Sequence, residues 1–239
     1  MLSSASYTDT GGRAVNEDST RQARVGEDRL CLVVADGLGG HGGGALASAA
    51  AADTICRAWR GEADPEALKH LVQMGHQAVA ALQTPQCAMK STVVALELAG
   101  NRAAWAHVGD SRLYHFIDGM LVFQTRDHSA SQIAVFMGEI TVDQIRFHED
   151  RNRVLRALGQ DGALTVEAGW ETLRPGRHAF LLCSDGFWEY VLENEMAGDL
   201  VHAADPLDWL ARMRGRLMAR VPADNDNNTA AAAWVDIPV

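Results

Sequence analysis

The chain has 239 residues, 47% of them apolar, which is enough to fill the core of one domain. Its 22 glycines and 6 prolines are too few for a low-complexity, disordered chain. Its 21 basic and 31 acidic residues leave a net charge of −10, which argues against nucleic acid and membrane surfaces as partners. No apolar run approaches the roughly 18 residues of a membrane-spanning helix. The first residues also lack the basic and apolar regions of a signal peptide.

The first predicted elements surround a glycine-rich turn. Leu30 to Ala35 is a short apolar run that indicates a buried strand and stops at Asp36-Gly37. The turn covers residues 37–44. An alanine-rich segment at 45–59 and an apolar-periodic segment at 65–82 then predict two helices.

The rest of the chain predicts mostly antiparallel strands, because glycine-containing turns separate several apolar segments as in β-hairpins. The predicted strands are 91–98, 102–108, 113–117, 120–124, 164–173, 178–183 and 229–235. Further helices are predicted at 130–138, 194–203 and 206–219. Residues 139–153 are polar and weakly periodic, and they predict a mobile excursion.

This order of elements does not alternate as in a parallel βαβ protein. It favours an α+β fold in which two antiparallel sheets are flanked by helix pairs. No repeat or linker is evident, so we expect a single domain over residues 1–239, with a flap excursion at about 130–153.

Four cysteines are scattered along the chain without a Cys-x-x-Cys pair: Cys31, Cys56, Cys87 and Cys183. Cys31 and Cys183 lie inside apolar runs, as small core residues do. The spacing favours free thiols over disulfides or a zinc site. Because free thiols are typical of a reducing compartment, we expect a cytoplasmic protein.

An aspartate stands at one end of four predicted strands: Asp36, Asp110, Asp185 and Asp226. Neighbouring strands lie about 4.8 Å apart, so carboxylates at one edge of a sheet can converge. Such a cluster repels itself unless a cation is bound, and all-oxygen ligands select Mg²⁺ or Mn²⁺. Asp-Gly pairs that merely form turns are the alternative, but four such aspartates favour a metal site.

Several spaced motifs extend this cluster. They are Arg13-Ala14-Val15-Asn16-Glu17-Asp18, Asp36-Gly37-Leu38-Gly39-Gly40-His41, Val108-Gly109-Asp110-Ser111-Arg112, Asp127-His128-Ser129, Asn152 to Gly159, Ser184-Asp185-Gly186 and Asp226-Asn227-Asn228-Thr229. With these motifs the chain resembles the PP2C-type (PPM) serine/threonine protein phosphatases, in particular the short bacterial form, over roughly residues 5–236. The resemblance implies a four-layer αββα sandwich.

The resemblance also implies a set of metal ligands for two Mn²⁺ or Mg²⁺ ions. Asp36 would bridge the two ions, and the Gly37 carbonyl would bind one of them. Asp185 and Asp226 would complete the other site. Asp110, with Asp185, would hold a third, weaker ion.

Other residues receive roles around these ions from the same resemblance. Glu17 and Asp18 would orient metal-bound waters. Arg13 would bind the substrate phosphate, because its planar fork suits phosphate oxygens. His41 would be the general acid for the leaving alkoxide. A surface salt bridge is the alternative for Arg13, and a solvated loop residue is the alternative for His41.

The sequence leaves one ligand open and departs from the family pattern at two positions. Asp224 and Asp226 both precede an asparagine, and the spacing to the last strand favours Asp226. Ala45 stands where the family usually has an acid, which could weaken the orientation of His41 or the helix terminus. Lys90 stands where the family has glycine, either as an ordinary surface cation or as an added phosphate contact.

The function implied is hydrolysis of phosphoserine and phosphothreonine in proteins, by direct attack of a metal-bridging water. The implied partners are phosphorylated protein substrates and a bacterial serine/threonine kinase, with the phosphatase as a monomer. Two alternatives are a catalytically weak, PP2C-like binding or regulatory protein and a hydrolase of a small phosphorylated metabolite. The complete set of acids favours the enzyme acting on proteins. The flap would either select substrates or be ordinary solvated variation.

Overall fold

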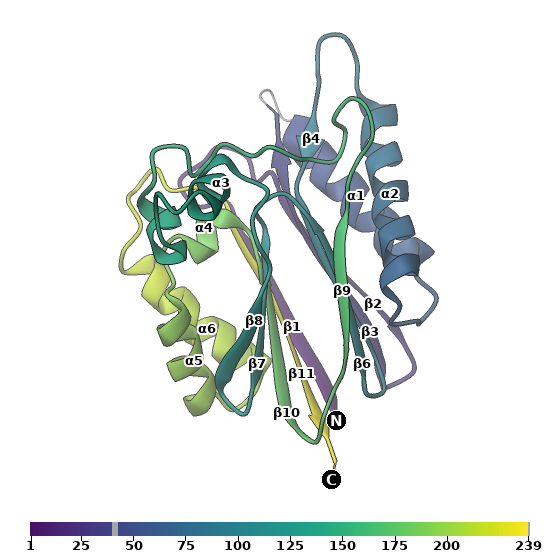
Figure 1. Cartoon of the computed structure of the whole chain (residues 1–239), viewed down its shortest axis with the longest axis vertical. Coiled ribbons are helices and arrows are strands. Elements are labelled where there is room, and N and C mark those ends of the chain that lie inside the picture. The colour runs from purple at the N-terminus through teal and green to yellow at the C-terminus, as the bar shows by residue number, and fades with distance from the viewer. Residues whose placement is uncertain (40–42, 239) are drawn as a thin grey trace.

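The computed structural model describes residues 1–39 and 43–238. Two antiparallel sheets stack face to face, and helices cover the outer face of each (Figure 1). The α+β fold class and the four-layer sandwich are therefore confirmed. Both termini of the described chain lie at the same end of the molecule, because the first and last strands pair with each other.

One sheet has five strands. In spatial order they are β1 (Leu2–Asp9), β11 (Asn228–Ile237), β10 (Gly176–Cys183), β7 (Arg112–Ile117) and β8 (Met120–Gln124). Helices α5 (Glu193–His202) and α6 (Pro206–Met218) lie on its outer side (Figure 1).

The other sheet has six strands. Its main path is β2 (Asp18–Val25), β3 (Arg29–Leu38), β5 (Val93–Ala99), β6 (Arg102–Val108) and β9 (Glu167–Thr172), and the short β4 (Lys90–Ser91) pairs with the end of β3. Helices α1 (Gly43–Ala58) and α2 (Pro65–Leu82) cover its outer side (Figure 1). Asp64 caps α2, since its carboxylate accepts from the Glu66 and Ala67 amides, and Pro65 fits the first turn.

Three further short elements lie near one end of the sandwich: α3 (Ala130–Phe136), the 3₁₀ helix η2 (Val142–Phe147) and α4 (Asp185–Trp188). Residues 139–153 are thus not irregular throughout, because η2 folds within them and buries Ile145 and Arg146. A short 3₁₀ turn with mixed polarity leaves no periodic pattern in the sequence.

The continuous apolar run in β3 is explained by burial on both faces of the strand. Leu30, Leu32 and Val34 pack between the two sheets, whereas the residues between them in the sequence pack under α1 and α2. Each fully buried side chain of this kind contributes about 1.5–3 kcal/mol. The alanines of α1, such as Ala47 and Ala51, let that helix approach the sheet closely.

Two strands were missed by the sequence analysis, and one ends later than predicted. The strands β1 and β2 were not predicted, because both are edge strands whose polar residues face solvent and mask the alternation. Asp36 does not end its strand: β3 continues to Leu38, and Asp36 lies opposite Asp18 of β2. The pairing with β4 carries β3 two residues further than its apolar run indicates.

Candidate metal centre

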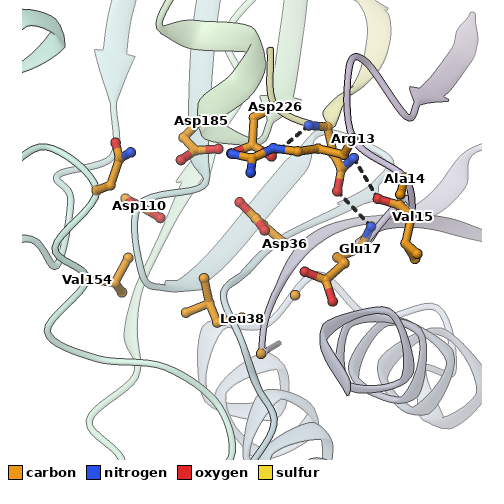
Figure 2. Close-up of a pocket in the computed structure, with 14 residues that line it drawn as sticks. Arg13, Ala14, Val15, Glu17, Asp36, Leu38, Asp110, Val154, Asp185 and Asp226 are labelled. Atoms are coloured by element: carbon orange, nitrogen blue, oxygen red, sulfur yellow. Dashed lines mark hydrogen bonds and ion pairs between the residues drawn. The ribbon is translucent and has the colours of Figure 1, made fainter. Parts of the chain in front are cut away.

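A pocket of about 670 Å³ is lined by residues of β3 and of segments that adjoin strands of both sheets. Figure 2 shows the carboxylates of Asp36, Asp110, Asp185 and Asp226 around this space, with Arg13 and Glu17 on one side. The four aspartates that the sequence singled out are therefore brought together.

Each aspartate comes from a different element. Asp36 lies on β3, and Asp110 lies in the turn between β6 and β7. Asp185 is the first residue of α4, directly after β10, and Asp226 precedes β11. The six-stranded sheet thus supplies Asp36, the five-stranded sheet supplies Asp185 and Asp226, and Asp110 joins the two. The pocket exists only where the two sheets pack together.

The carboxylates raise one another's pKa values in this setting. Burial raises the pKa of Asp36 well above its usual range, and the neighbouring charges of Asp18, Asp185 and Asp110 raise it further. Burial likewise raises the pKa of Asp110 and of Asp185. Burial and mutual repulsion both disfavour the charged forms of these acids, which is the electrostatic signature of a site built for positive charge.

The donor set fits hard divalent cations. Asp110 Oδ2 is buried without a hydrogen-bond partner among the described residues, so it has an oxygen to offer a cation. The backbone is also adapted, since a Cβ on Gly37 would lie 2.0 Å from the Gly44 carbonyl oxygen. Only glycine allows β3 to approach the start of α1 so closely. Carboxylates and a backbone carbonyl are ligands typical of Mg²⁺ and Mn²⁺.

Arg13 and Glu17 line the same pocket from the segment before β2. Arg13 Nη2 donates to Asp226 Oδ2 at 2.8 Å, while 55% of the Arg13 side chain stays exposed. Its remaining N–H groups can therefore still meet a phosphate. Glu17 lies against Gly44 at the start of α1. Since the first turn of that helix has no acid, Glu17 supplies negative charge at the helix end where Ala45 does not.

Asp18 is buried next to Asp36 but is not among the residues that line the pocket. Its Oδ2 accepts from Ser184 Oγ at 2.7 Å, and its Oδ1 has no partner in the described part of the chain. Burial raises the pKa of Asp18 to about 7. Asp18 therefore supports the site from a buried position across the β2–β3 pair from Asp36.

The other site residues can be placed only in part. His41 lies outside the described residues, so its role stays a prediction from the sequence. Asp226 lines the pocket and Asp224 does not, which favours Asp226 as the ligand. Lys90 of β4 pairs with Leu38 of β3, which lines the pocket, but Lys90 is not itself among the lining residues.

Two pocket residues were missed as functional candidates. Asn227 accepts from the Glu17 amide at 2.7 Å and donates to the Thr10 and Val15 carbonyls, so it fastens the segment that carries Arg13. Asn152 lines the pocket after the flap. Both residues belong to sequence motifs named above, and this position in a motif could have identified them as candidates.

A buried network holds the turn that carries Asp110. The Asp110 carbonyl accepts from Trp188 Nε1 at 2.9 Å, and the Arg112 guanidinium stacks 3.5 Å from the centre of the Trp188 ring. Arg112 also makes two hydrogen bonds to Asp127, of 2.8 and 2.7 Å. This network explains why the Gly109-Asp110-Ser111-Arg112 and Asp127-His128-Ser129 motifs occur together.

A second group of possible ligands, His107, His128 and Glu167, contacts the residue before Asp110 through His128. His128 Nδ1 accepts from the Gly109 amide at 3.1 Å, so a neutral ring carries its proton on Nε2, which faces Glu167 at 3.4 Å. That nitrogen has no lone pair for a cation. Burial lowers the pKa of His128 to about 4, which keeps the ring neutral. The group is therefore a hydrogen-bonded cluster rather than a second metal site.

Comparison with known proteins agrees with this fold. The family model for protein phosphatase 2C matches residues 11–226. The serine/threonine protein phosphatase PstP of Mycobacterium tuberculosis is 35% identical over 230 residues, a match that covers 90% of this chain and 43% of PstP. The chain thus spans less than half the length of that relative.

Solved structures match over nearly the whole chain. The Mycobacterium tuberculosis serine/threonine phosphatase PstP/Ppp superposes with a TM-score of 0.82 at 32% identity, over 100% of this chain and 99% of that one. The catalytic domain of PstP in complex with two manganese ions matches with a TM-score of 0.81 at 30% identity, over 98% and 99%. The fold and the pocket together define a class of protein, a two-sheet sandwich with buried carboxylates gathered between its sheets. Within it, the chain belongs to the protein phosphatase 2C family.

Across the residues that the structure describes, no helix is long and apolar enough to cross a membrane. All four cysteines are free thiols, and Cys31 and Cys183 are buried as expected.

Proposed function

We propose that the chain is a metal-dependent protein serine/threonine phosphatase that hydrolyses phosphoserine and phosphothreonine. The observation that carries the proposal is the convergence of Asp36, Asp110, Asp185 and Asp226 in one pocket beside Arg13. Membership of the protein phosphatase 2C family and the named relatives support it.

The residues divide into those that would hold cations and those that would meet the substrate. Asp36, the Gly37 carbonyl, Asp185 and Asp226 would hold two Mn²⁺ or Mg²⁺ ions, and Asp110 with Asp185 would hold a third. When bound, the ions supply positive charge for the phosphoryl oxygens and lower the pKa of a water molecule. The PstP catalytic domain with two manganese ions supports the choice of cation.

The substrate would be held and released by other groups. The exposed N–H groups of Arg13 would orient the phosphate oxygens, since its contact with Asp226 uses only Nη2. Glu17 and Asp18 would orient the waters around the cations, Glu17 from the pocket wall and Asp18 from its buried position next to Asp36. His41 would give a proton to the leaving serine or threonine oxygen, because a poor alkoxide leaving group needs an acid.

The decisive experiment is phosphate release from a phosphothreonine peptide, with and without Mn²⁺, for the wild type and for Asp185→Ala. We expect Mn²⁺-dependent turnover in the wild type and a loss of at least about a hundredfold in Asp185→Ala. A binding or regulatory protein without catalysis would show no turnover in either. A metabolite phosphatase would act on small phosphate esters and leave the peptide intact.

The partners follow from the same chemistry. We infer that the substrates are phosphorylated proteins and that the opposing enzyme is a serine/threonine kinase. The four free thiols support a cytoplasmic location. A monomer is the simplest state for a pocket built from residues of a single chain.

A further inference from the structure

The peptide before Asp110 has an unusual backbone. Gly109 adopts φ +104°, a conformation that glycine reaches readily and other residues rarely do. A Cβ at Gly109 would also lie 2.7 Å from the Thr92 side chain. Because the residue cannot carry a side chain, other groups must hold its peptide in place, and the direction of Asp110 depends on that peptide.

His128 holds the Gly109 backbone through two hydrogen bonds, one to each of the peptide groups that flank the Gly109 Cα. Its ring Nδ1 accepts the Gly109 N–H at 3.1 Å, and its own backbone N–H donates to the Gly109 carbonyl at 2.8 Å. One residue thereby pairs with both polar groups of the residue that precedes Asp110. A buried N–H left without its acceptor costs more free energy than an ordinary hydrogen bond contributes.

His128 is itself held by two further contacts. Its ring stacks on the His107 ring, with centroids 4.7 Å apart and planes 6° apart. His107 is held by the Arg126 carbonyl at 2.8 Å. The His128 carbonyl accepts from the Leu155 amide at 2.7 Å, next to Val154 of the pocket wall. Only 9% of His128 is exposed.

We propose that His128 is a positioning residue that aims the Asp110 carboxylate into the pocket through the Gly109 peptide. It touches neither the substrate nor the cations, and its effect would fall on the weakest cation site, to which Asp110 contributes. This inference rests on the proposed function. The alternative is that His128 merely fills space between the Asp110 turn and His107.

Three substitutions separate these readings. His128→Phe keeps a flat ring against His107 but removes the Nδ1 acceptor. His128→Asn removes the stacking but places an amide oxygen near the position of Nδ1. Glu167→Gln is the matched control, because it changes the partner of the other ring nitrogen and leaves the Gly109 contact intact.

The primary readout is Mn²⁺ binding by calorimetry, which needs no turnover. We expect His128→Phe to weaken the weakest Mn²⁺ site about tenfold, with the tighter sites unchanged. His128→Asn should stay within about threefold of the wild type, and Glu167→Gln should match it. In assays at limiting Mn²⁺, His128→Phe should lower kcat while KM for the phosphopeptide stays constant.

Three results would overturn the proposal. They are unchanged Mn²⁺ binding in His128→Phe, equal losses in His128→Phe and His128→Asn, or the same loss in Glu167→Gln. Should His128→Phe fail to fold, nitrogen chemical shifts of the wild-type His128 ring in metal-free protein decide the matter. Nδ1 must be unprotonated and bonded to the Gly109 amide, and a protonated Nδ1 refutes the idea. Absent turnover in the wild type would instead refute the proposed function, while the binding arm still tests His128.

Discussion

At the scale of single residues, the neighbouring acids Asp224 and Asp226 show how position decides role. Asp226 lies in the pocket, accepts from Arg13 and from the Asn227 amide, and points toward Asp185 (Figure 2). Asp224, two residues earlier, does not line the pocket. The two side chains differ in nothing except where the turn before β11 directs them.

We therefore expect Asp226→Asn to lower Mn²⁺ affinity by about tenfold to a hundredfold, because a carboxylate ligand is lost. Asp224→Asn is the matched control and should bind Mn²⁺ as the wild type does. Isothermal titration calorimetry at constant pH measures both. Equal losses in the two variants would show that Asp224 is a ligand after all.

Glu97 is a buried residue whose ionisation has a measurable cost in folding free energy. It lies on β5 with its side chain fully buried, and its only partner among the described residues is the Asp64 amide at 3.2 Å. Burial raises the pKa of Glu97 from 4.5 to about 8. A carboxyl with a raised pKa favours folding while it is protonated, so this contribution is complete below about pH 4.5 and is lost as the pH rises through 8.

Glu97→Gln should therefore flatten the dependence of stability on pH. Between pH 5 and pH 8.5 we expect the unfolding free energy of the wild type to fall by about 1–3 kcal/mol more than that of the variant. Urea unfolding at both pH values measures the difference. Glu27→Gln, at an exposed position, is the control and should follow the wild type. A parallel fall in all three proteins would assign the loss to other groups.

At the scale of elements, the 3₁₀ helix η2 is anchored by one buried arginine. Arg146 is 6% exposed, forms an ion pair with Glu193 at the start of α5, and lies 5.7 Å from the Trp188 ring. Trp188 in turn donates to the Asp110 carbonyl. The flap is therefore linked to the turn that carries Asp110 through the side chains of Arg146 and Trp188.

Arg146→Met should loosen η2, because the variant keeps the apolar stem but leaves Glu193 without its closest cation. We expect amide hydrogen exchange over residues 139–153 to become about tenfold faster or more, while exchange in the sheets stays unchanged. Arg153→Met is the matched control, since Arg153 is exposed and has no acidic partner in the residues described. Unchanged exchange in Arg146→Met would mean that packing alone holds the flap.

Elements with strong local signals could be predicted from the sequence, and elements held by tertiary contacts could not. The bounds of α2 follow from Pro65 and its periodicity, and the turn between β7 and β8 follows from Asp118-Gly119. The edge strand β1 carries no such signal, because its pairing with β11 comes from distant sequence. Likewise, the motif spacing identified the aspartates, but only the packing of the sheets shows that Asp18 is buried outside the pocket lining and that His128 holds the turn of Asp110.

At the scale of the whole molecule, the acidic residues of the pocket come from both sheets or from segments next to them. Asp36 belongs to one sheet, and Asp185 and Asp226 adjoin strands of the other. Like charges brought together by the stacking of the sheets oppose it until a cation is bound. Cation binding and the stability of the sandwich are therefore linked.

Adding Mn²⁺ should raise the melting temperature, because the cation binds the folded chain and not the unfolded one. At a concentration of about 100 times Kd, one site contributes about 2.7 kcal/mol, or roughly 5–10 °C for a chain of this length. Differential scanning calorimetry with Mn²⁺ and with a chelator measures the shift, which should shrink in Asp185→Asn. The same shift in Asp185→Asn as in the wild type would place the stabilising cation elsewhere.

The antiparallel pairing of β1 with β11 has a consequence for biosynthesis. Strand β11 inserts between β1 and β10, so β1 has no neighbour in its sheet until that late segment leaves the ribosome. Arg13 likewise meets Asp226 across a separation of 213 residues. A nascent chain that has not yet released β11 lacks one of its proposed cation ligands and the partner of its proposed phosphate-binding arginine. The proposed phosphatase activity would therefore be absent during translation and appear only once this segment has been released.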